Sequence, residues 1–367
     1  MSRLRAALGE LAQEAPDVAP TTDLAALAVA NHQRHRRNIT MATAFFATVA
    51  LVGAVTAGVT LNGSGQAAPA TSSVPADLPA GKVGALSHAY LTQCEIDESQ
   101  APPSFDCSQV EWRVVTRTGR TYRVPQALAT SVTDSRSPVA LSRDGRMFAY
   151  YSRKEGTYVV RDLVAGTQVV SRAKVKESKI DRGAMLVVSE DGRHLAFDPR
   201  EGSKYPGLLI DVRTGETTTL NGKYEAIGIK DGLVELIRYL KTDLWLMPVT
   251  GGGKPVRFPG TYIMFSELAP DGRTVAAIEF DEMRKRKVTL LDTKTGRVVR
   301  KVTVKGAPDV KSPGSVRIWA SASEVMVDYQ VGKELRSYAV NVDTGKARLV
   351  QKVSLTTAQE VILPADW

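Results

Sequence analysis

Short apolar runs separated by polar turns fill most of the chain from about residue 110 to residue 353. Two of these runs are "GLLIDV" at 207–212 and "KVTLLDT" at 287–293. Runs of this length that are bounded by Gly, Asp and Ser are typical of β-strands. The pattern therefore predicts an all-β domain made of many short strands.

Two series of turns interleave along this region. In the first series an Asp-Gly pair precedes an apolar strand, and successive pairs lie 47, 40 and 40 residues apart. Glycine adopts the positive φ that a tight turn requires, and the aspartate can bond the backbone of its own turn. The four pairs are Asp144-Gly145, Asp191-Gly192, Asp231-Gly232 and Asp271-Gly272.

The second series contains turns such as "RTGRTYRV" at 118–125 and "DTGKARLV" at 343–350, each after an apolar strand. Two hairpins in every repeat make four strands in about 40 to 50 residues, which is the size of a β-propeller blade. Six turns of this kind favour six blades, although drift within 83–110 could hide a seventh. The ring would close if "AQEVILP" at 358–364 completed the first blade beside "GALSHAYL" at 84–91.

A small residue recurs at a fixed distance after the Asp-Gly turn. Ala149, Ala196 and Ala276 hold this position, and a larger apolar residue precedes each of them. A small side chain lets neighbouring sheets approach closely while the larger neighbour fills the gap. We interpret the repeated alanine as a packing requirement between blades.

The repeats also carry a family resemblance. The pattern Ser-x-Asp-Gly-Arg-x-apolar-Ala-aromatic occupies Ser142–Tyr150 and Ser189–Phe197, and a third copy has Ala269 in place of the serine. This pattern resembles the WD40-like (TolB-type) β-propeller repeat. Copies at 228–237 and 316–325 are degenerate. The resemblance implies a β-propeller of about six four-stranded blades.

A single transmembrane helix is predicted ahead of the propeller. Ile39 to Leu61 is a run of 23 residues without a charge, long enough to cross a hydrocarbon core of about 30 Å as a helix. The basic segment "RHRR" at 34–37 precedes the run, and the next cation is Lys82. This asymmetry predicts a cytoplasmic N-terminus and an extracellular C-terminal domain. The alternative is a cleaved signal peptide with "APA" at 68–70 as its cleavage site.

Four segments follow from these patterns. Residues 1–38 are expected to form a short helical cytoplasmic tail, residues 39–61 the transmembrane helix, and residues 83–367 the extracytoplasmic propeller. The segment 62–82 is rich in Pro, Gly, Ser and Ala, which predicts an extended linker that tethers the propeller without docking on it. Small residues at four-residue spacing in the span, from Ala50 to Gly58, would permit a homodimer through the helix.

Cys94 and Cys107 are the only two cysteines, and both follow the predicted span. An even number of cysteines in an oxidising compartment predicts a disulfide, which would close the loop "CEIDESQAPPSFDC" and contribute about 3 kcal/mol in the chain-entropy model. The alternative is a pair of free thiols with a metal or redox role. No C-x-x-C motif supports that alternative.

The sequence offers little catalytic chemistry. His88 and His194 are the only histidines outside the tail, and both occupy predicted strands. No G-x-S-x-G motif occurs, and "GGGK" at 251–254 lacks the spacing of a phosphate-binding loop. We therefore expect a protein that is not an enzyme, with no catalytic residues, no cofactor and no metal site.

The most consistent function is that of a membrane-anchored binding module. The net charge of +9 could favour nucleic acid, anionic lipid or an anionic wall polymer, but the predicted topology argues against nucleic acid. The architecture is similar to that of single-pass actinobacterial propeller proteins. We expect a protein, a peptide or an anionic cell-envelope polymer as partner. Two alternatives are signalling from the ectodomain to the cytoplasmic tail and a hydrolase or lyase in the propeller funnel. The residues that bind the ligand are not identified by the sequence.

Overall fold

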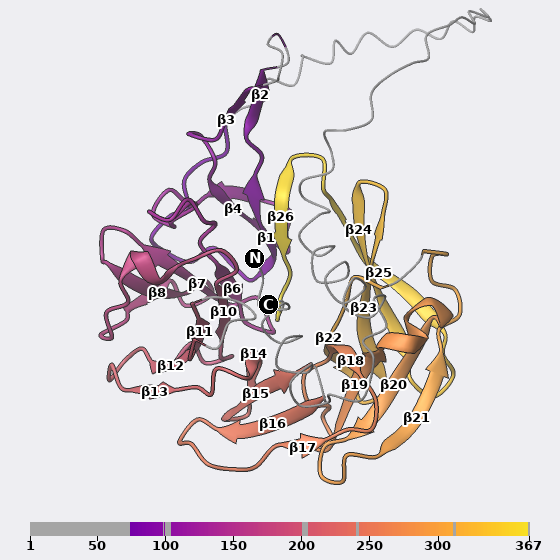
Figure 1. The fold of residues 1–367 in the computed structure, drawn as a ribbon. Coiled ribbons are helices and arrows are strands. Elements are labelled where there is room, and N and C mark those ends of the chain that lie inside the picture. The colour runs from indigo at the N-terminus through magenta and orange to yellow at the C-terminus, as the bar shows by residue number, and fades with distance from the viewer. Residues whose placement is uncertain are drawn as a thin grey trace, which may run out of the picture.

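Six small antiparallel sheets surround a common centre in the computed structural model, which describes residues 74–97, 99, 104–199, 205–239, 242–310 and 313–365 (Figure 1). The predicted cytoplasmic tail, the predicted transmembrane helix at 39–61 and most of the predicted linker lie outside these residues. Within the part that the structure describes, no helix is both long enough and apolar enough to cross a membrane.

Each sheet is a blade of four antiparallel strands, and in blades 2 to 6 strands that follow one another in the chain are hydrogen-bonded neighbours. The first strand lies toward the centre of the ring and the fourth at its outer edge (Figure 1). The strands of blades 1 to 3 are β26 (Ala358–Ile362), β1 (Leu86–Thr92), β4 (Trp112–Thr116), β5 (Thr121–Arg123); β6 (Val139–Leu141), β7 (Met147–Ser152), β8 (Thr157–Asp162), β9 (Thr167–Val170); β10 (Met185–Val188), β11 (His194–Asp198), β12 (Leu208–Asp211), β13 (Thr217–Thr219). Those of blades 4 to 6 are β14 (Glu225–Lys230), β15 (Leu233–Arg238), β16 (Asp243–Pro248), β17 (Val256–Arg257); β18 (Tyr262–Phe265), β19 (Thr274–Glu279), β20 (Lys287–Asp292), β21 (Val298–Thr303); β22 (Ser315–Ser321), β23 (Glu324–Val331), β24 (Glu334–Asn341), β25 (Ala347–Ser354).

Blade 1 joins the two ends of the propeller. Its innermost strand β26 comes from the C-terminal end of the chain and pairs with β1, with Ala89 opposite Ile362 and Tyr90 opposite Val361. This pairing confirms the predicted closure of the ring by the segment 358–364. The six blades of the described chain also confirm the predicted architecture, because the segment 83–110 contributes β1 and the hairpin β2 (Glu95–Asp97)–β3 (Ser104–Asp106), with no seventh blade.

The repeated alanine lies between blades, as its small size predicts. Ala149 belongs to the apolar cluster between blades 2 and 3, whereas its neighbour Phe148 belongs to the cluster between blades 1 and 2. Alternate residues of a strand point to opposite faces, so each second strand serves two interfaces. Ala196 and Ala276 likewise face the following blade and are fully buried. Complete burial of a side chain such as Phe148 stabilises the fold by about 1.5–3 kcal/mol.

The side of blade 6 that faces away from blade 5 buries polar groups beside the apolar Met326 and Ala339. Val316 and Val327 pack toward blade 5, whereas Arg317 and Asp328 lie on the opposite face and form a buried ion pair. Arg317 Nη1 also donates to the carbonyl of Pro364 over 2.8 Å, directly after β26. The last blade is therefore attached to the closing strand through a buried guanidinium.

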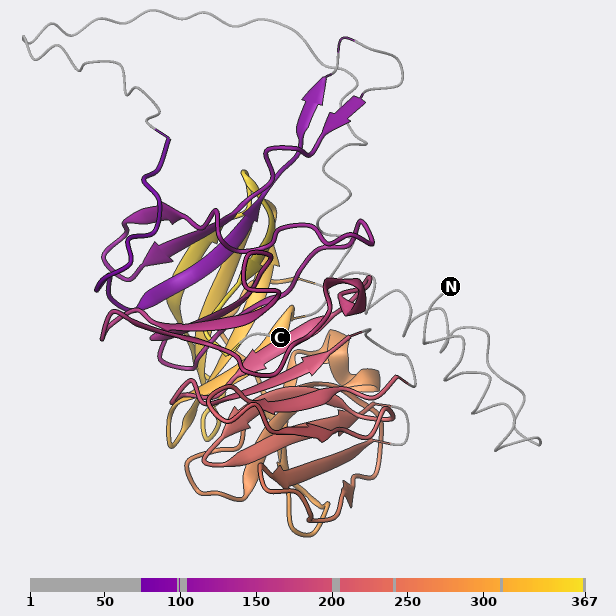
Figure 2. The same ribbon diagram turned by 90° about the vertical axis from the view of Figure 1, so that its left-hand side faces the viewer.

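The end of the predicted linker belongs to the propeller. Leu78 N–H donates to the carbonyl of Arg123 at the end of β5, and Val83 N–H donates to the carbonyl of Leu163 just after β8, each over 2.8 Å. The Leu78 side chain is buried in the cluster between blades 1 and 2. The segment 76–84 thus crosses the outer edge of these two blades, because its apolar residues Leu78 and Val83 and its backbone donors find partners there (Figure 2).

Candidate functional site

The intact repeat copies build a hydrogen-bonded turn between the first and second strands of their blades. In blade 2, Ser142 Oγ donates to Asp144 Oδ1 over 2.6 Å and accepts from the Met147 N–H over 2.8 Å. Asp144 Oδ1 also accepts from the Arg146 N–H over 3.0 Å. The serine and aspartate of the motif therefore satisfy backbone donors, and the glycine between them and the strand reverses the chain with a φ of 70° at Gly145.

The same turn recurs with small variations. Ser189 Oγ donates to Asp191 Oδ1 over 2.6 Å in blade 3. In blade 5, where Ala269 replaces the serine, Thr274 Oγ1 donates to Asp271 Oδ2 over 2.6 Å. The degenerate turn of blade 4 has a positive φ at both Asp231 and its glycine, as a two-residue hairpin turn of type I′ requires. The remaining turn glycines have φ values of 67° at Gly192, 74° at Gly232 and 65° at Gly272.

The arginine of the motif ties the two hairpins of a blade together. Arg146 Nε donates to Asp162 Oδ1 over 2.8 Å, at the end of the third strand. Asp162 Oδ1 also accepts the N–H of Ala165 in the second turn, and these bonds, led by that of Arg146, lower the pKa of Asp162. The equivalent pairs are Arg193–Asp211 and Arg273–Asp292. The turn residues thus have structural partners, which accounts for the spacing of the repeat.

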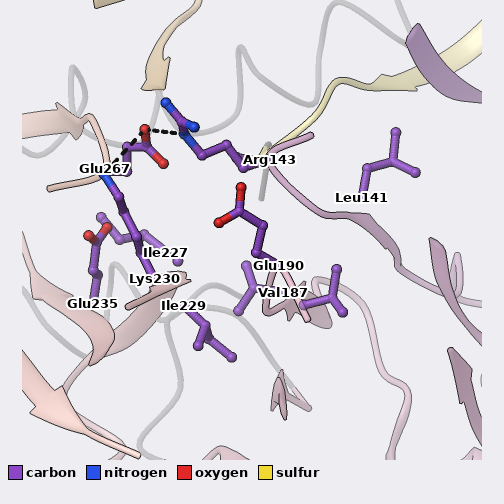
Figure 3. A pocket seen from close by; sticks show the side chains of 12 residues that line it. Leu141, Arg143, Val187, Glu190, Ile227, Ile229, Lys230, Glu235 and Glu267 are labelled. Carbon is purple, nitrogen blue, oxygen red and sulfur yellow. Dashed lines mark hydrogen bonds and ion pairs between the residues drawn. The ribbon is translucent and has the colours of Figure 1, made fainter. Parts of the chain in front are cut away.

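A charged cluster lies near the centre of the ring, at and just beyond the ends of the inner strands. Glu267, which follows β18, pairs through Oε1 with Arg143 Nε over 2.7 Å and with Lys230 Nζ over 3.7 Å. The same oxygen accepts the N–H of Trp319 over 3.0 Å. Figure 3 shows the Arg143 and Lys230 side chains converging on Glu267, with Glu190 pointing toward the same space. The ends of successive inner strands supply these side chains, so that only the ring brings them together.

Glu235 lies behind this cluster and is fully buried. Its Oε1 accepts the N–H of Leu268 over 2.7 Å. Gly228 lies opposite Glu235 in the sheet, and a Cβ there would come within 2.9 Å of Glu235 Oε2. Burial, opposed by the Leu268 hydrogen bond and assisted by the charge of Glu267, raises the pKa of Glu235 to about 8. The carboxyl group is therefore largely protonated at neutral pH.

The space beside this cluster is too small for an organic substrate. The cavity lined by Arg143, Lys230 and Glu267 has a volume of about 30 Å³, which accommodates roughly two water molecules. The protonated Glu235 could act as a general acid only if a substrate could reach it. We interpret the cluster as a set of polar contacts that links blades 2, 4, 5 and 6.

The predicted disulfide is confirmed. Cys94 and Cys107 are bonded at the base of the hairpin β2–β3, with their Cα atoms 4.3 Å apart. The hairpin is an insertion between β1 and β4 of blade 1, and it projects away from the ring (Figures 1 and 2). A two-stranded hairpin alone is at best marginally stable in water, so the disulfide holds the two short strands together.

The hairpin exposes an apolar pair on one face, and carboxylates alternate with this pair along its strands. Ile96 and Phe105 are cross-strand partners with 42% and 58% of their surface exposed. Neither residue belongs to an apolar cluster of the propeller. Glu95, Asp97 and Asp106 flank the pair on the same strands. We call these five residues the hairpin patch.

The two histidines outside the tail are poor candidates for a general base. Burial lowers the pKa of His88 to about 4, so that its ring is neutral at physiological pH. His194 begins β11, and its Nε2 lies 4.0 Å from Asp211, the carboxylate that also pairs with Arg193. Both histidines occupy strands, as the sequence predicts.

Sequence reasoning missed both the central cluster and the hairpin patch. Arg143 and Glu190 occupy the variable position of the repeat, and Glu267 lies just before the third copy, so that each looks like an ordinary surface residue of a turn. Residues from different blades share no local pattern. The hairpin patch had one signal in the sequence, because the loop between the two cysteines carries several carboxylates and two large apolar residues.

Comparison with known proteins finds similarity among solved structures. No family model matches the chain, and no curated protein matches it. Among solved structures it is similar to TolB from Acinetobacter baumannii, with 18% identity, a TM-score of 0.46 and coverage of 75% of this chain and 65% of that chain. It is also similar to the RRP9 WD40 repeats (12% identity, TM-score 0.44, 75% and 86% coverage) and to virginiamycin B lyase from Staphylococcus aureus (10%, 0.43, 74% and 86%). The chain spans less than two thirds of the TolB structure. All three structures are less than 25% identical to this chain, so function must be argued from its own residues.

Proposed function

We propose that this protein is a membrane-anchored, extracytoplasmic β-propeller that binds a protein or peptide partner through the hairpin patch. The observation that carries the proposal is the exposure of Ile96 and Phe105 on a disulfide-closed hairpin that projects from the ring. An exposed apolar pair on a protruding element is costly in water unless a partner covers it. The propeller core contains neither residue, which supports contact with a partner as their role.

The charge of the patch specifies the partner. Glu95, Asp97 and Asp106 alternate with the apolar pair along the two strands, so they place negative charge on the opposite face of the hairpin, on a chain whose net charge is +9. A partner that contacts both faces of the hairpin would present aliphatic or aromatic residues to one face and Lys or Arg to the other. The short strands also leave free edges to which an extended peptide could add as a strand. We therefore favour a basic, partly apolar protein segment over an anionic polymer as the partner of this patch.

The disulfide and the N-terminal sequence support the cellular location. Disulfides persist in oxidising compartments, which favours exposure of the Cys94–Cys107 bond outside the cytoplasm. The charge-free run 39–61 with its basic N-terminal flank supports an anchor that keeps the N-terminus in the cytoplasm. Protease added to intact spheroplasts should then digest the propeller and spare the tail. Protection of the propeller until the membrane is broken would overturn this topology.

Binding through the hairpin patch can be tested with peptides on the full chain purified in detergent. The variant I96S/F105S should weaken the binding of peptides that alternate lysine with leucine at least about tenfold, because it removes the apolar contact. The control is V298S/V299S on the outer strand β21, where both valines are also exposed. Fluorescence anisotropy at two salt concentrations measures the affinity and its electrostatic part.

Crosslinking in cells provides the matching test in the natural setting. A photoreactive residue at position 105 should form an adduct with an envelope protein, whereas one at position 299 should not. If I96S/F105S binds the peptides as well as the parent chain does, the hairpin patch is not the contact surface. If I96S/F105S and V298S/V299S bind an anionic wall polymer with the same affinity, the polymer binds to another surface of the protein.

A further inference from the structure

A second cavity lies between blades 1 and 2, beneath the segment 76–84. It has a volume of about 240 Å³, several times that of the central cavity, and is lined by residues such as Tyr150, Ser152 and Arg161 of blade 2. Leu78 and Ala80 cover it, and Lys154 and Glu155 from the turn between β7 and β8 stand at its edge. A cavity of this size accommodates a small organic molecule, unlike the central one.

Arg161 is the unusual residue of this cavity. It is only 3% exposed, and its Nη2 donates to the carbonyl of Pro79. In the part of the chain that the structure describes, no carboxylate forms an ion pair with it. Burial lowers the pKa of Arg161, but a guanidinium stays protonated in proteins. The chain thus buries a positive charge against a neutral carbonyl alone.

Arg317 is a second buried arginine, and its partners provide a comparison. It is also 3% exposed, and both oxygens of Asp328 and the hydroxyl of Ser337 accept from its guanidinium. A buried charge is costly unless it is paired and hydrogen-bonded. Arg161 has the same burial and one neutral partner, so its environment lacks the anion that Arg317 has.

We propose that the cavity between blades 1 and 2 binds a small ligand through a carboxylate that pairs with Arg161. Arg–carboxylate pairs are often bidentate, and Arg161 lines the cavity together with Tyr150 and Ser152. The charged groups around the cavity are Arg161, Lys154 and Glu155, with a sum of one positive charge. This charge matches a monoanion better than a phosphate group, which carries about −1.5 to −2 at neutral pH.

The position of Gln168 allows the missing carboxylate to be built into the chain. Gln168 lies directly opposite Arg161 in the pairing of β8 with β9, and it also lines the cavity. Its side chain is exposed, so that Gln168→Glu should not disturb the core. A glutamate there would occupy the place proposed for the ligand. It should raise the unfolding temperature of the chain and abolish its response to added carboxylates.

The experiment measures the thermal unfolding of the full chain in detergent at constant ionic strength. Acetate, butyrate and hexanoate are titrated separately, with chloride and inorganic phosphate as the other anions. Ligands that bind the folded state raise the unfolding temperature in a saturable manner. We expect saturable shifts with the carboxylates and none with phosphate or chloride. Arg161→Met should remove the response, because it keeps the length of the side chain without the charge.

Controls separate the ligand from general effects of salt. Arg300→Met removes an exposed arginine on β21 and should leave the carboxylate response unchanged. If the parent chain shows no saturable response to any carboxylate, or if Gln168→Glu and the parent chain respond equally, the proposal is wrong. An equal response to phosphate would assign the site to oxyanions in general and overturn the choice of a carboxylate. None of these results depends on the hairpin patch, so the two proposals fail separately.

Discussion

Gly145 and Gly272 occupy the same position of the repeat turn, but their surroundings differ. Both have a positive φ, of 70° and 65°. A Cβ at position 145 would lie 2.3 Å from the carbonyl oxygen of Leu86, whereas one at position 272 would meet nothing within 4 Å. At the scale of the residue, the turn of blade 5 requires glycine for its backbone conformation alone. The turn of blade 2 requires it also because a side chain would clash with blade 1.

These two glycines form a matched pair for mutation. Gly272→Ala should destabilise the folded chain by about 1 kcal/mol, because a side chain in the left-handed region is strained. Gly145→Ala should cost at least about 3 kcal/mol, because the backbone of blade 1 must also move away. Chemical denaturation of the two variants measures the difference. Equal losses of stability in the two variants would show that the backbone of blade 1 at Leu86 can move away without cost.

The burial of Glu235 predicts a dependence of stability on pH. Its folded pKa of about 8 lies above the ordinary value of 4.5, so the folded state holds a proton that the unfolded state has released between these values. The contribution of this group to stability is complete below pH 4.5 and falls by about 1.4 kcal/mol per pH unit until pH passes 8. Glu267, Lys230 and Asp231 are the charged groups that act on it.

Glu235→Gln should therefore stabilise the protein at pH 8 and change little at pH 4. The amide oxygen of glutamine can still accept the N–H of Leu268, which preserves the local hydrogen bond. Denaturation curves of both chains at several pH values provide the measurement. Parallel pH profiles would mean that Glu235 is ionised in the folded protein.

At the scale of the element, β26 has the largest single role. It is the innermost strand of blade 1, and the strand that precedes it in the chain is the outermost strand of blade 6. Ala89 and Ile362 are paired across β1 and β26 and are both buried. Without β26, blade 1 would have three strands and an open edge beside the centre of the ring. Joining the two ends of the chain in one sheet closes the propeller.

Removal of residues 358–367 should abolish the cooperative unfolding of the propeller at 25 °C. A peptide of the same sequence, added in excess, should restore part of the transition, because it can pair with β1. Calorimetry of the truncated chain with this peptide and with a scrambled one makes the comparison. A truncated chain that unfolds like the parent would show that β26 does not close the ring.

At the scale of the whole molecule, the ring is held by apolar contacts between consecutive blades and by polar contacts where it closes. Five apolar clusters join neighbouring blades from 1 to 6. Arg317 and Asp328, with Ser315 and Ser337 as additional partners, lie on the face of blade 6 that turns away from blade 5. The bond from Arg317 to Pro364 extends this network to the closing segment.

Asp328→Asn should destabilise the ring by about 3–5 kcal/mol, because it leaves Arg317 buried without a carboxylate. The double variant R317M/D328L should recover most of this loss, since it removes both charges. Asp343→Asn, which breaks the exposed pair with Arg300, should cost less than about 1 kcal/mol. Thermal unfolding of the three variants tests this order. A loss in D328N no larger than in D343N would contradict the importance of the buried pair.

The sequence by itself determined the strands, the repeat and the ring. The Asp-Gly turns, the alanine at the position of Ala149 and the segment 358–364 are local signals, because turn geometry and strand alternation depend on neighbouring residues. The disulfide between Cys94 and Cys107 could also be predicted, since the chain has only these two cysteines.

Only the tertiary structure decided which polar residues meet. Arg143 and Glu267 lie more than a hundred residues apart and pair because the ring brings blade 2 and blade 5 to one centre. Arg161 looks like a surface arginine in its strand, and it became the unpaired charge of a cavity only when the segment 76–84 covered it. Burial and long-range pairing depend on how the blades pack against one another. The blades share one repeat, so no short stretch of sequence shows which of their polar residues are buried or paired in the ring.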